Sequence, residues 1–311
     1  MKRIAILGAS SRIAGDLILW LAQQPGTALH LFVRRPQQML DWLHQNGIAC
    51  HAQVGSYAHF GEGGEYFALI NFVGVGDPAR ALSMGAEILD LTHRFDSLAL
   101  EYVQRHPRCR YLFTSSGAAY GSRFESPVDE DSQAAFPINA LGSDAWYGMA
   151  KAHAECRHRA HAGLPIMDIR IFNYISRTQD LSARFLVTDA LRAIRDRTIL
   201  QTSAARTVRD YLHASDFCAL VDAVLAAPPA NDVIDCYSKA PIEKTELLQA
   251  LQAAFGLRYT VSPEQAGVNA TGHKPCYYSL NRRASRFGYA PALSSLDGVL
   301  DATAALLDAG V

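Results

Sequence analysis

The sequence has little of what builds metal centres, disulfide frameworks or membrane spans. Its six cysteines are widely spaced and include no Cys-x-x-Cys pair, so neither a zinc site nor a set of disulfides is expected, and a reducing compartment is favoured. No apolar run approaches the ~18 residues of a membrane span, and the first residues lack the apolar core of a signal peptide. We therefore expect a cytoplasmic protein that does not enter a membrane and binds no metal.

The sequence also lacks an excess of charge of either sign. Lys and Arg number 29 against 30 Asp and Glu, a net charge of -1, which gives no long-range attraction to nucleic acid or to an anionic membrane. Lysine itself is scarce, because five of the 29 basic residues are lysine and 24 are arginine. Arginine is the better bidentate ligand of phosphate, so this bias fits a phosphate-bearing ligand without demonstrating one.

Apolar residues make up 49% of the 311 residues, enough for two domains or for one large α/β unit with an appended lobe. In the first part of the chain, short apolar runs typical of strands alternate with amphipathic stretches typical of helices. The expected strands are Arg3–Leu7, Leu29–Val33, Ile48–Val54, Phe67–Val73 and Cys109–Ser115, and the expected helices are Arg12–Gln24, Gln37–Asn46 and Ala79–His106. This alternation predicts a doubly wound parallel sheet of the Rossmann type, with helices on both faces.

The rest of the chain is less regular and predicts a smaller, mainly C-terminal α/β lobe. The expected elements are a helix at Asp144–His161, a strand at Pro165–Phe172, a helix at Arg184–Arg195, a strand at Thr207–Leu212 and a helix at Ala214–Ala227. Because no low-complexity linker separates them, we expect the two domains to interleave. Residues 1–173 and 207–235 are assigned to the Rossmann domain, and residues 174–206 and 236–311 to the second lobe.

The turn after the first expected strand resembles a phosphate-binding loop. It runs from Gly8 to Gly15, where the amides at a helix start can face a pyrophosphate. Ser11 and Ala14 stand where a fuller motif has glycine, so an ordinary strand–helix turn is the alternative. The residues expected to line a dinucleotide here are Gly8, Ser10, Ser11, Arg12 and Ile13.

The second expected strand does not end in an acidic residue. A carboxylate at that place binds a free ribose 2′-hydroxyl, whereas a guanidinium pairs with a 2′-phosphate. Here Val33 is followed by Arg34 and Arg35. This favours NADP(H) over NAD, with Arg34 as the first ligand and Arg12 or Arg35 assisting; solvated surface arginines are the alternative.

Tyr147 and Lys151 are four residues apart on an expected helix and therefore share one face. A nearby ammonium favours the phenolate, so we expect Lys151 to lower the pKa of Tyr147 and adapt it to acid–base work. The pair follows the segment Thr114–Gly121, whose hydroxyls come at the carboxyl end of the fifth expected strand.

In this order and spacing, the Gly8 loop, the Ser-Ser-Gly-Ala-Ala-Tyr-Gly segment at 115–121 and the Tyr147–Lys151 pair resemble the extended short-chain dehydrogenase/reductases. Further segments resemble the branch of that family that contains nucleotide-sugar epimerases, dehydratases and reductases. They are Arg170–Asn173, Arg209–Asp216, Gly272–Pro275 and Asn281–Pro291. The resemblance covers essentially the whole chain.

The resemblance implies a role for each matching position. It implies that Ser116 hydrogen-bonds the reacting sugar oxygen, that Tyr147 is the general acid and base, and that Lys151 holds the nicotinamide ribose. It further implies that Asn173 and Arg209 bind a nucleotide diphosphate, with Lys274 near the place of a phosphate-binding arginine. The segment implied to line the cofactor is Asn71, Phe72, Val73 and Gly74, although this sequence departs from the branch's usual His-x-Ala-Ala.

The implied function is hydride transfer at C4 of a nucleotide-diphosphate sugar by a homodimer that pairs the helices at 79–106 and 144–161. A 4-keto reductase that uses NADPH is slightly favoured over a 4-epimerase with tightly bound NAD, and a non-catalytic dinucleotide-sensing regulator is a third alternative. Dehydration is not expected. The 4,6-dehydratases carry Thr-Asp-Glu where this chain has Ser116-Gly117-Ala118, which supplies neither the acid nor the base that elimination needs.

Two further features carry less weight. Tyr277 and Tyr278 are interpreted as packing residues rather than as a platform for a base. His213 lies in the Arg-Asp-Tyr-Leu-His segment, where a packed, hydrogen-bonded role is at least as well supported as contact with a ligand.

Overall fold

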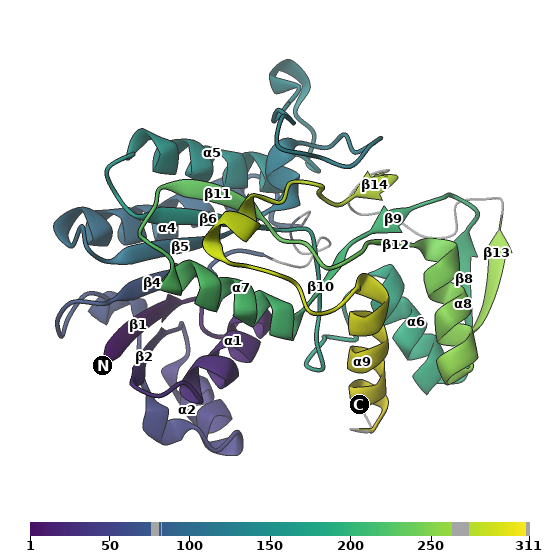
Figure 1. Ribbon diagram of the computed structural model, residues 1–311, viewed down its shortest axis with the longest axis horizontal. Coiled ribbons are helices and arrows are strands. Elements are labelled where there is room, and N and C mark those ends of the chain that lie inside the picture. The colour runs from purple at the N-terminus through teal and green to yellow at the C-terminus, as the bar shows by residue number, and fades with distance from the viewer. Residues whose placement is uncertain (76–80, 82, 263–273, 309–311) are drawn as a thin grey trace.

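The computed structural model describes residues 1–75, 81, 83–262 and 274–308, and its centre is one large parallel sheet (Figure 1). The strands of this sheet are β1 (Lys2–Leu7), β2 (Thr27–Phe32), β3 (Ala52–Gly55), β4 (Ala68–Asn71), β5 (Arg110–Ser116), β6 (Ile166–Ile171) and β11 (Asp232–Asp235). They lie in the order β11-β6-β5-β4-β1-β2-β3. The order changes direction at β1, which lies between β2 and β4. Open α/β sheets bind ligands at such a point, outside the carboxyl ends of the strands.

The two faces of the sheet are covered by different helices. Ile4 and Ile6 of β1 enter the core under α1 (Arg12–Ala22), α2 (Pro36–Gln45) and α7 (Ala214–Ala226). Ala5 and Leu7 enter the opposite core, under α4 (Glu87–Arg105) and α5 (Trp146–Ala160). Successive side chains of a strand point to opposite faces, so strands buried on both sides are apolar throughout. Figure 1 shows the two helical layers on either side of the sheet.

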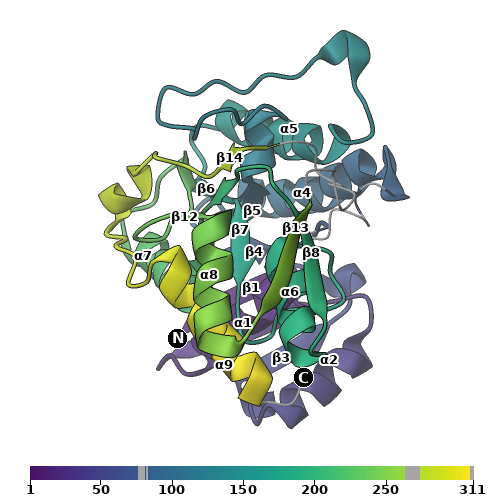
Figure 2. The same ribbon diagram turned by 90° about the vertical axis from the view of Figure 1, so that its right-hand side faces the viewer.

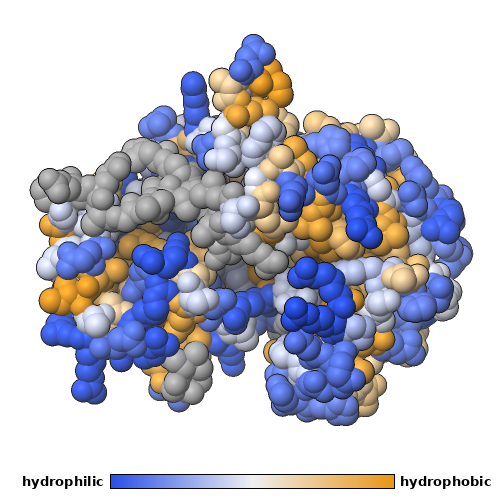
Figure 3. Space-filling view, turned by 180° about the vertical axis from the view of Figure 1, so that it is seen from behind, coloured by the Kyte–Doolittle hydropathy of each residue, from blue (hydrophilic) through white to orange (hydrophobic). Residues whose placement is uncertain are grey.

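The second lobe has its own apolar core, around α6 (Leu186–Arg195), α8 (Lys244–Phe255) and α9 (Ser295–Asp308) (Figure 2). At its edge, β8 (Ile199–Ser203) pairs with β13 (Arg258–Ser262). Two small sheets complete the fold: β7 (Asn173–Ile175) pairs with β10 (Tyr211–His213), and β9 (Val208–Arg209) lies between β12 (Ile242–Glu243) and β14 (Cys276–Tyr277). Seen from the back, a hollow separates the two lobes along the lower edge (Figure 3).

The predicted doubly wound sheet is confirmed, and some elements differ from their expected extents. The expected strand at 48–54 contains a 3₁₀ turn at Ala49–His51 before β3 begins. In the expected helix at 79–106, α4 begins at Glu87, and residues 79, 80 and 82 lie outside the described part. The expected strand at 207–212 is divided between β9 and β10, which belong to different sheets, and β8 and β13 were not expected.

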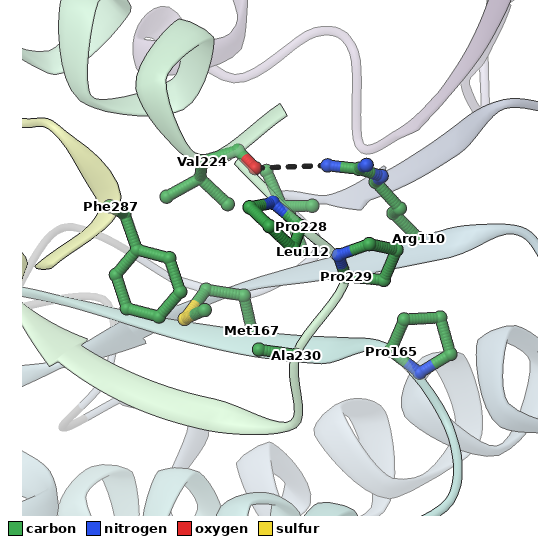
Figure 4. Close-up of a pocket in the computed structure, with 9 residues that line it drawn as sticks. All are labelled: Arg110, Leu112, Pro165, Met167, Val224, Pro228, Pro229, Ala230 and Phe287. Carbon is green, nitrogen blue, oxygen red and sulfur yellow. Dashed lines mark hydrogen bonds between the residues drawn. The ribbon is translucent and has the colours of Figure 1, made fainter. Parts of the chain in front are cut away.

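The amino ends of β5 and β6 border a small pocket of mostly apolar side chains (Figure 4). There the Arg110 guanidinium donates from Nη1 to the main-chain oxygens of Val224, Leu225 and Ala227, at 3.1, 2.9 and 2.7 Å. These oxygens lie at the C-terminal end of α7, where no later amide of the helix can donate to them. Because the pocket lies at the edge of the sheet opposite to the strands' carboxyl ends, we assign it to the fold and not to the site.

The described part of the chain bears on membrane spans, metal sites and disulfides. No helix there is long and apolar enough to cross a membrane. Nor do His, Cys, Asp and Glu side chains of these residues form a group arranged to hold a metal ion. The six cysteines are free thiols.

Candidate active site

The turn after β1 brings the main chains of two strands very close together. Gly8 has a φ of +73°, and a Cβ there would lie 2.8 Å from the carbonyl carbon of Phe72 and from the amide nitrogen of Val73. Glycine suits both the left-handed conformation and this approach. Ser11 then caps α1, because its side chain accepts a hydrogen bond from the amide of Ala14 at 3.2 Å. The first-turn amides have no acceptor within the helix and form an anion-binding end beside Ser10, Arg12 and Ile13.

The segment at 71–74 leaves β4 from a buried asparagine. Asn71 donates from Nδ2 to the phenol of Tyr111 at 3.0 Å and accepts at Oδ1 from the amide of Val73 at 2.9 Å. These bonds fix the direction of the chain as it leaves the strand. A Cβ at Gly74 would lie 3.4 Å from Nζ of Lys151. The exit of β4 and the helix α5 therefore meet at this point.

Ser116, Tyr147 and Lys151 are brought together, because Ser116 ends β5 and the other two lie in the first turns of α5. The Tyr147 phenol lies within hydrogen-bond reach of Ser116. Nζ of Lys151 donates to the main-chain oxygen of Thr114 at 2.7 Å and lies 4.4 Å from the ring centroid of Phe113. Burial lowers the pKa of Lys151 to about 8, although the nearby carboxylates of Glu155, Asp96 and Asp168 favour its charged form.

The pKa of Tyr147 differs from the sequence expectation. We expected Lys151 to lower it, but Nζ of Lys151 lies 5.9 Å from the ring centroid, against the face of the ring. Burial raises the pKa of Tyr147 above its usual 10.0, and the hydrogen bond with Ser116 opposes that rise. Tyr147 is therefore a protonated phenol at neutral pH, which suits a general acid.

Tyr277, interpreted above as a packing residue, places its phenol beside Ser116, in the cluster that also contains Tyr147. Its Oη lies 3.3 Å from Oγ of Ser116. It reaches the site through β14, which pairs with β9 in a register that sets Tyr277 opposite Arg209. No pattern in the sequence marks this contact, because two-residue strands have no periodicity and the two hydroxyls are 161 positions apart.

Two cations lie around Tyr277. Arg209 donates from Nη1 to the main-chain oxygens of Val208 and Pro275, at 2.9 and 3.3 Å. Nζ of Lys274 lies 4.7 Å from the ring centroid of Tyr277. Burial lowers the pKa of both groups, and the charge of Arg209 lowers that of Lys274 further, to about 8. Within the described residues neither cation forms an ion pair with a carboxylate, so a bound anion would relieve their repulsion.

Asn173 and His213 have clear places near these cations. Asn173 donates from Nδ2 to the main-chain oxygens of Asp210 and Tyr277, at 3.1 and 3.4 Å. His213 caps α7 through Ser215, and its Nε2 lies 3.3 Å from a carboxylate oxygen of Asp301. The packed, hydrogen-bonded interpretation of His213 therefore agrees with the structure, and Asn173 supports the strand that carries Tyr277.

The three arginines expected near a 2′-phosphate are not equally available. Arg34 and Arg35 are exposed where β2 leads into α2, and neither forms an ion pair or a side-chain hydrogen bond with another described residue. Arg12 instead donates to the main-chain oxygen of Thr178 at 2.7 Å and pairs with Asp180 at 3.3 Å. Arg34 and Arg35 are therefore more available than Arg12, and the assignment of all three to the dinucleotide stays a prediction.

A model of the family described as "NAD dependent epimerase/dehydratase family" matches residues 4–237. The chain belongs to this family. The matched region of this epimerase/dehydratase protein includes Ser116, Tyr147, Lys151 and Arg209, and it ends before β14. Lys274 and Tyr277 therefore reach the site from a part of the chain outside the family match.

One curated protein and several solved structures are similar to this chain. The dTDP-glucose 4,6-dehydratase of Streptomyces niveus is 23% identical over 246 residues, which cover 75% of this chain and 68% of that protein. A UDP-N-acetylglucosamine 4-epimerase from Methanobrevibacter ruminantium has a TM-score of 0.82 at 11% identity, covering 100% of this chain and 99% of its own. A UDP-glucose-4-epimerase from Stenotrophomonas maltophila, solved with bound NAD, has a TM-score of 0.81 at 15% identity, covering 99% and 100%. These structural similarities show that the fold is shared.

Proposed function

We propose that this family member transfers hydride at C4 of a nucleotide-activated sugar and works as a 4-keto reductase. The observation that carries the proposal is the placement of two kinds of group around Tyr277. The hydroxyls of Ser116 and Tyr147 suit a reacting carbonyl or hydroxyl. The cations Arg209 and Lys274, which form no ion pair with another described residue, suit a diphosphate. A nucleotide-diphosphate sugar carries both partners, and Asn173 would border its nucleotide.

The residues around the β1–α1 turn fit a nicotinamide dinucleotide, which supplies the hydride when it is bound. Gly8 leaves no side chain between the turn and β4, and the first turn of α1 offers amides to a pyrophosphate. The residues that would border this group are Ser10, Ser11 and Ile13 at the turn and Asn71, Phe72, Val73 and Gly74 after β4. Lys151, next to Gly74, would hold the nicotinamide ribose.

In the reducing direction, Tyr147 would donate a proton to the C4 oxygen of the sugar. Its raised pKa keeps the phenol protonated at neutral pH, as an acid requires. Ser116 would hydrogen-bond the same oxygen as negative charge develops there. Lys151, fixed to β5 through Thr114, would hold the face of the Tyr147 ring.

Dehydration is poorly supported even though the curated relative is a 4,6-dehydratase. Elimination needs an added acid and base after the serine, where this chain has Gly117 and Ala118. A Cβ at Gly117 would lie 2.4 Å from the ring of Phe172, so an acidic side chain does not fit there while Phe172 keeps its position. This crowding supports hydride transfer without loss of water.

A 4-epimerase with tightly bound NAD is the second candidate. It is favoured by the similar epimerase structures, including one solved with bound NAD. Arg34 and Arg35, with no carboxylate at the end of β2, favour an exchangeable NADPH and hence the reductase.

The cofactor content of the purified protein tests this choice. We expect no stoichiometric dinucleotide after denaturation, and tighter binding of NADPH than of NADH when each is added. Arg34→Ala should weaken NADPH binding about tenfold or more, because a charge-assisted hydrogen bond is lost, and leave NADH binding unchanged. Stoichiometric NAD(H) would instead support the epimerase, and a protein that binds neither dinucleotide would contradict both enzyme functions.

Tyr147→Phe tests the acid. Turnover of a nucleotide 4-ketosugar, measured as NADPH oxidation, should fall by about two to three orders of magnitude, because the proton donor is removed. The dissociation constant for NADPH serves as the control and should stay nearly unchanged. Normal turnover by this variant would refute the assignment of Tyr147.

A further inference from the structure

The phenol of Tyr277 is held firmly against Ser116. Its ring lies between Phe124 and Phe172, with centroid distances of 4.7 and 5.1 Å, and Lys274 covers it. The strand β14 fixes its main chain through the pairing with β9. This environment leaves the hydroxyl at 3.3 Å from Oγ of Ser116. The contact therefore results from the packing of several elements and not from a mobile side chain.

The hydrogen bonds around Ser116 decide where its single proton points. A serine hydroxyl donates once and accepts twice. Oγ of Ser116 accepts from the amide of Ala118 at 3.2 Å, which leaves one acceptor site and one proton for the phenols of Tyr147 and Tyr277. Either hydroxyl of the Ser116–Tyr277 pair can be the donor, and donation by Tyr277 leaves the Ser116 proton for Tyr147.

We propose that Tyr277 is a positioning residue whose phenol donates to Ser116 and so directs the Ser116 proton toward Tyr147. The chain of donors then runs from Tyr277 to Ser116 to Tyr147. A hydroxyl that accepts a hydrogen bond becomes a better donor, so this arrangement stabilises the Tyr147 phenolate that forms when Tyr147 gives its proton to the reacting oxygen. The catalytic meaning of the arrangement rests on the proposed function, but the arrangement itself does not.

Tyr277→Phe tests the kinetic part, with Tyr278→Phe as a matched control on the next residue. With a nucleotide 4-ketosugar and NADPH, Tyr277→Phe should lower kcat about three- to tenfold, as the loss of one neutral hydrogen bond predicts, with KM unchanged. The fall in rate that follows ionisation of Tyr147 should move to higher pH. Tyr278→Phe should match the wild type in both respects. An unchanged kcat and pH profile in Tyr277→Phe would overturn the proposal.

A second measurement needs no substrate and separates this proposal from the proposed function. In protein labelled with ¹³Cζ-tyrosine, the Tyr147 signal, identified by its loss in Tyr147→Phe, is titrated with pH. Its pKa should rise by about half a unit to one unit in Tyr277→Phe and stay constant in Tyr278→Phe. In a Ser116→Ala background the Tyr277 substitution should have no further effect.

Failure of the proposed function and failure of the positioning role of Tyr277 give different experimental results. A wild type without turnover of nucleotide ketosugars refutes the proposed function, while a Tyr147 pKa that responds to Tyr277 still supports the positioning role. An equal Tyr147 pKa in the Tyr277 and Tyr278 variants refutes the positioning role, whatever the activity. An effect of Tyr277→Phe that persists in the Ser116→Ala background also refutes it, because the two phenols would then interact directly.

Discussion

His158 lies between two buried carboxylates behind the candidate site. Its Nδ1 lies 2.6 Å from Asp168 and its Nε2 lies 2.6 Å from Asp96, and all three residues are fully buried. Burial lowers the pKa of His158, but the two carboxylates outweigh this effect and raise it to about 9. Asp96 also accepts a hydrogen bond from Tyr111, the partner of Asn71. The imidazolium therefore supports the residues that fix the exit of β4.

His158→Gln should destabilise the protein most at low pH, by about 2 kcal/mol, because Asp96 and Asp168 each lose a charged hydrogen-bond partner while they keep their ion pairs with Arg157 and Arg159. The folded pKa is raised, so the stabilisation by the proton is complete below the unfolded value of 6.5 and is lost as the pH rises through about 9. Urea unfolding across this range should show the difference between wild type and variant narrowing with rising pH. His161→Gln, which affects a partly exposed ring near Gln104, is the control. A difference independent of pH would mean that His158 is neutral in the folded protein.

Residue-level prediction from the sequence succeeds where the contact is local. Tyr147 and Lys151 could be paired because a separation of four positions on a helix decides that they share a face. Tyr277 and His158 could not be found in this way, since each meets its partners through packing between distant elements. The direction of the Tyr147 pKa was predicted wrongly for the same reason, because burial of the phenol depends on its tertiary surroundings.

At the scale of elements, the turn from β1 to α1 depends on glycine at one position. Gly8→Ala should destabilise the protein by clearly more than Gly26→Ala. Both glycines have a positive φ, of +73° and +75°, so both variants lose about 1 kcal/mol to the left-handed conformation. A Cβ at Gly26 meets nothing within 4 Å, whereas one at Gly8 would lie 2.8 Å from the main chain of β4's exit. Gly8→Ala should therefore unfold at a lower urea concentration than Gly26→Ala and should bind NADPH more weakly. Equal effects of the two variants would contradict this account.

The regular elements were predictable because their signal repeats along the chain. Strands such as β1, β2 and β5 contain mostly apolar central runs since helices cover both faces of the sheet, and this pattern is visible without a structure. The short strands β9, β10 and β14 have two or three residues each, too few for a period. Their pairing depends on the lobes that they join, so the part of the site that they carry could not be placed from the sequence.

At the scale of the whole molecule, the site lies where the two lobes meet. The Rossmann part contributes Gly8, Ser116 and Tyr147, and the second lobe contributes Tyr277. The lobes are tied beside the site by Asp16 of α1, which accepts hydrogen bonds from Tyr174 at 2.7 Å and from Thr178 at 3.0 Å. Our proposed division, residues 1–173 and 207–235 against 174–206 and 236–311, stays a prediction, and packing crosses it in both directions. Cys236, Tyr237, Ala284 and Tyr289 lie in the core of the sheet, whereas Tyr211 lies in the core of the second lobe. The C-terminal segment therefore belongs to both lobes.

The outer face of α5 supports the homodimer that we expect. Met149, Ala152, His153 and Cys156 recur on one side of the helix, are partly or fully exposed and carry no acidic, lysine or arginine side chain. His153 also packs beside His93 of α4, with ring centroids 5.6 Å apart, so the two helices present one continuous surface. A second copy that placed the same face against it would bury this stripe around a two-fold axis.

Light scattering during gel filtration tests this dimer. The wild type should have twice the monomer mass of 34.0 kDa at micromolar concentration. Ala152→Arg should give the monomer mass, because a guanidinium in the centre of the stripe would be buried against its own copy without a partner. Gln23→Arg, at the exposed end of α1 on the opposite face of the sheet, should remain a dimer. If Ala152→Arg keeps the mass of the wild type, the second copy lies elsewhere; if the wild type itself has the monomer mass at every concentration, the chain works alone. The Ala152→Arg monomer should still bind NADPH, since every residue that we assign to the cofactor belongs to a single chain.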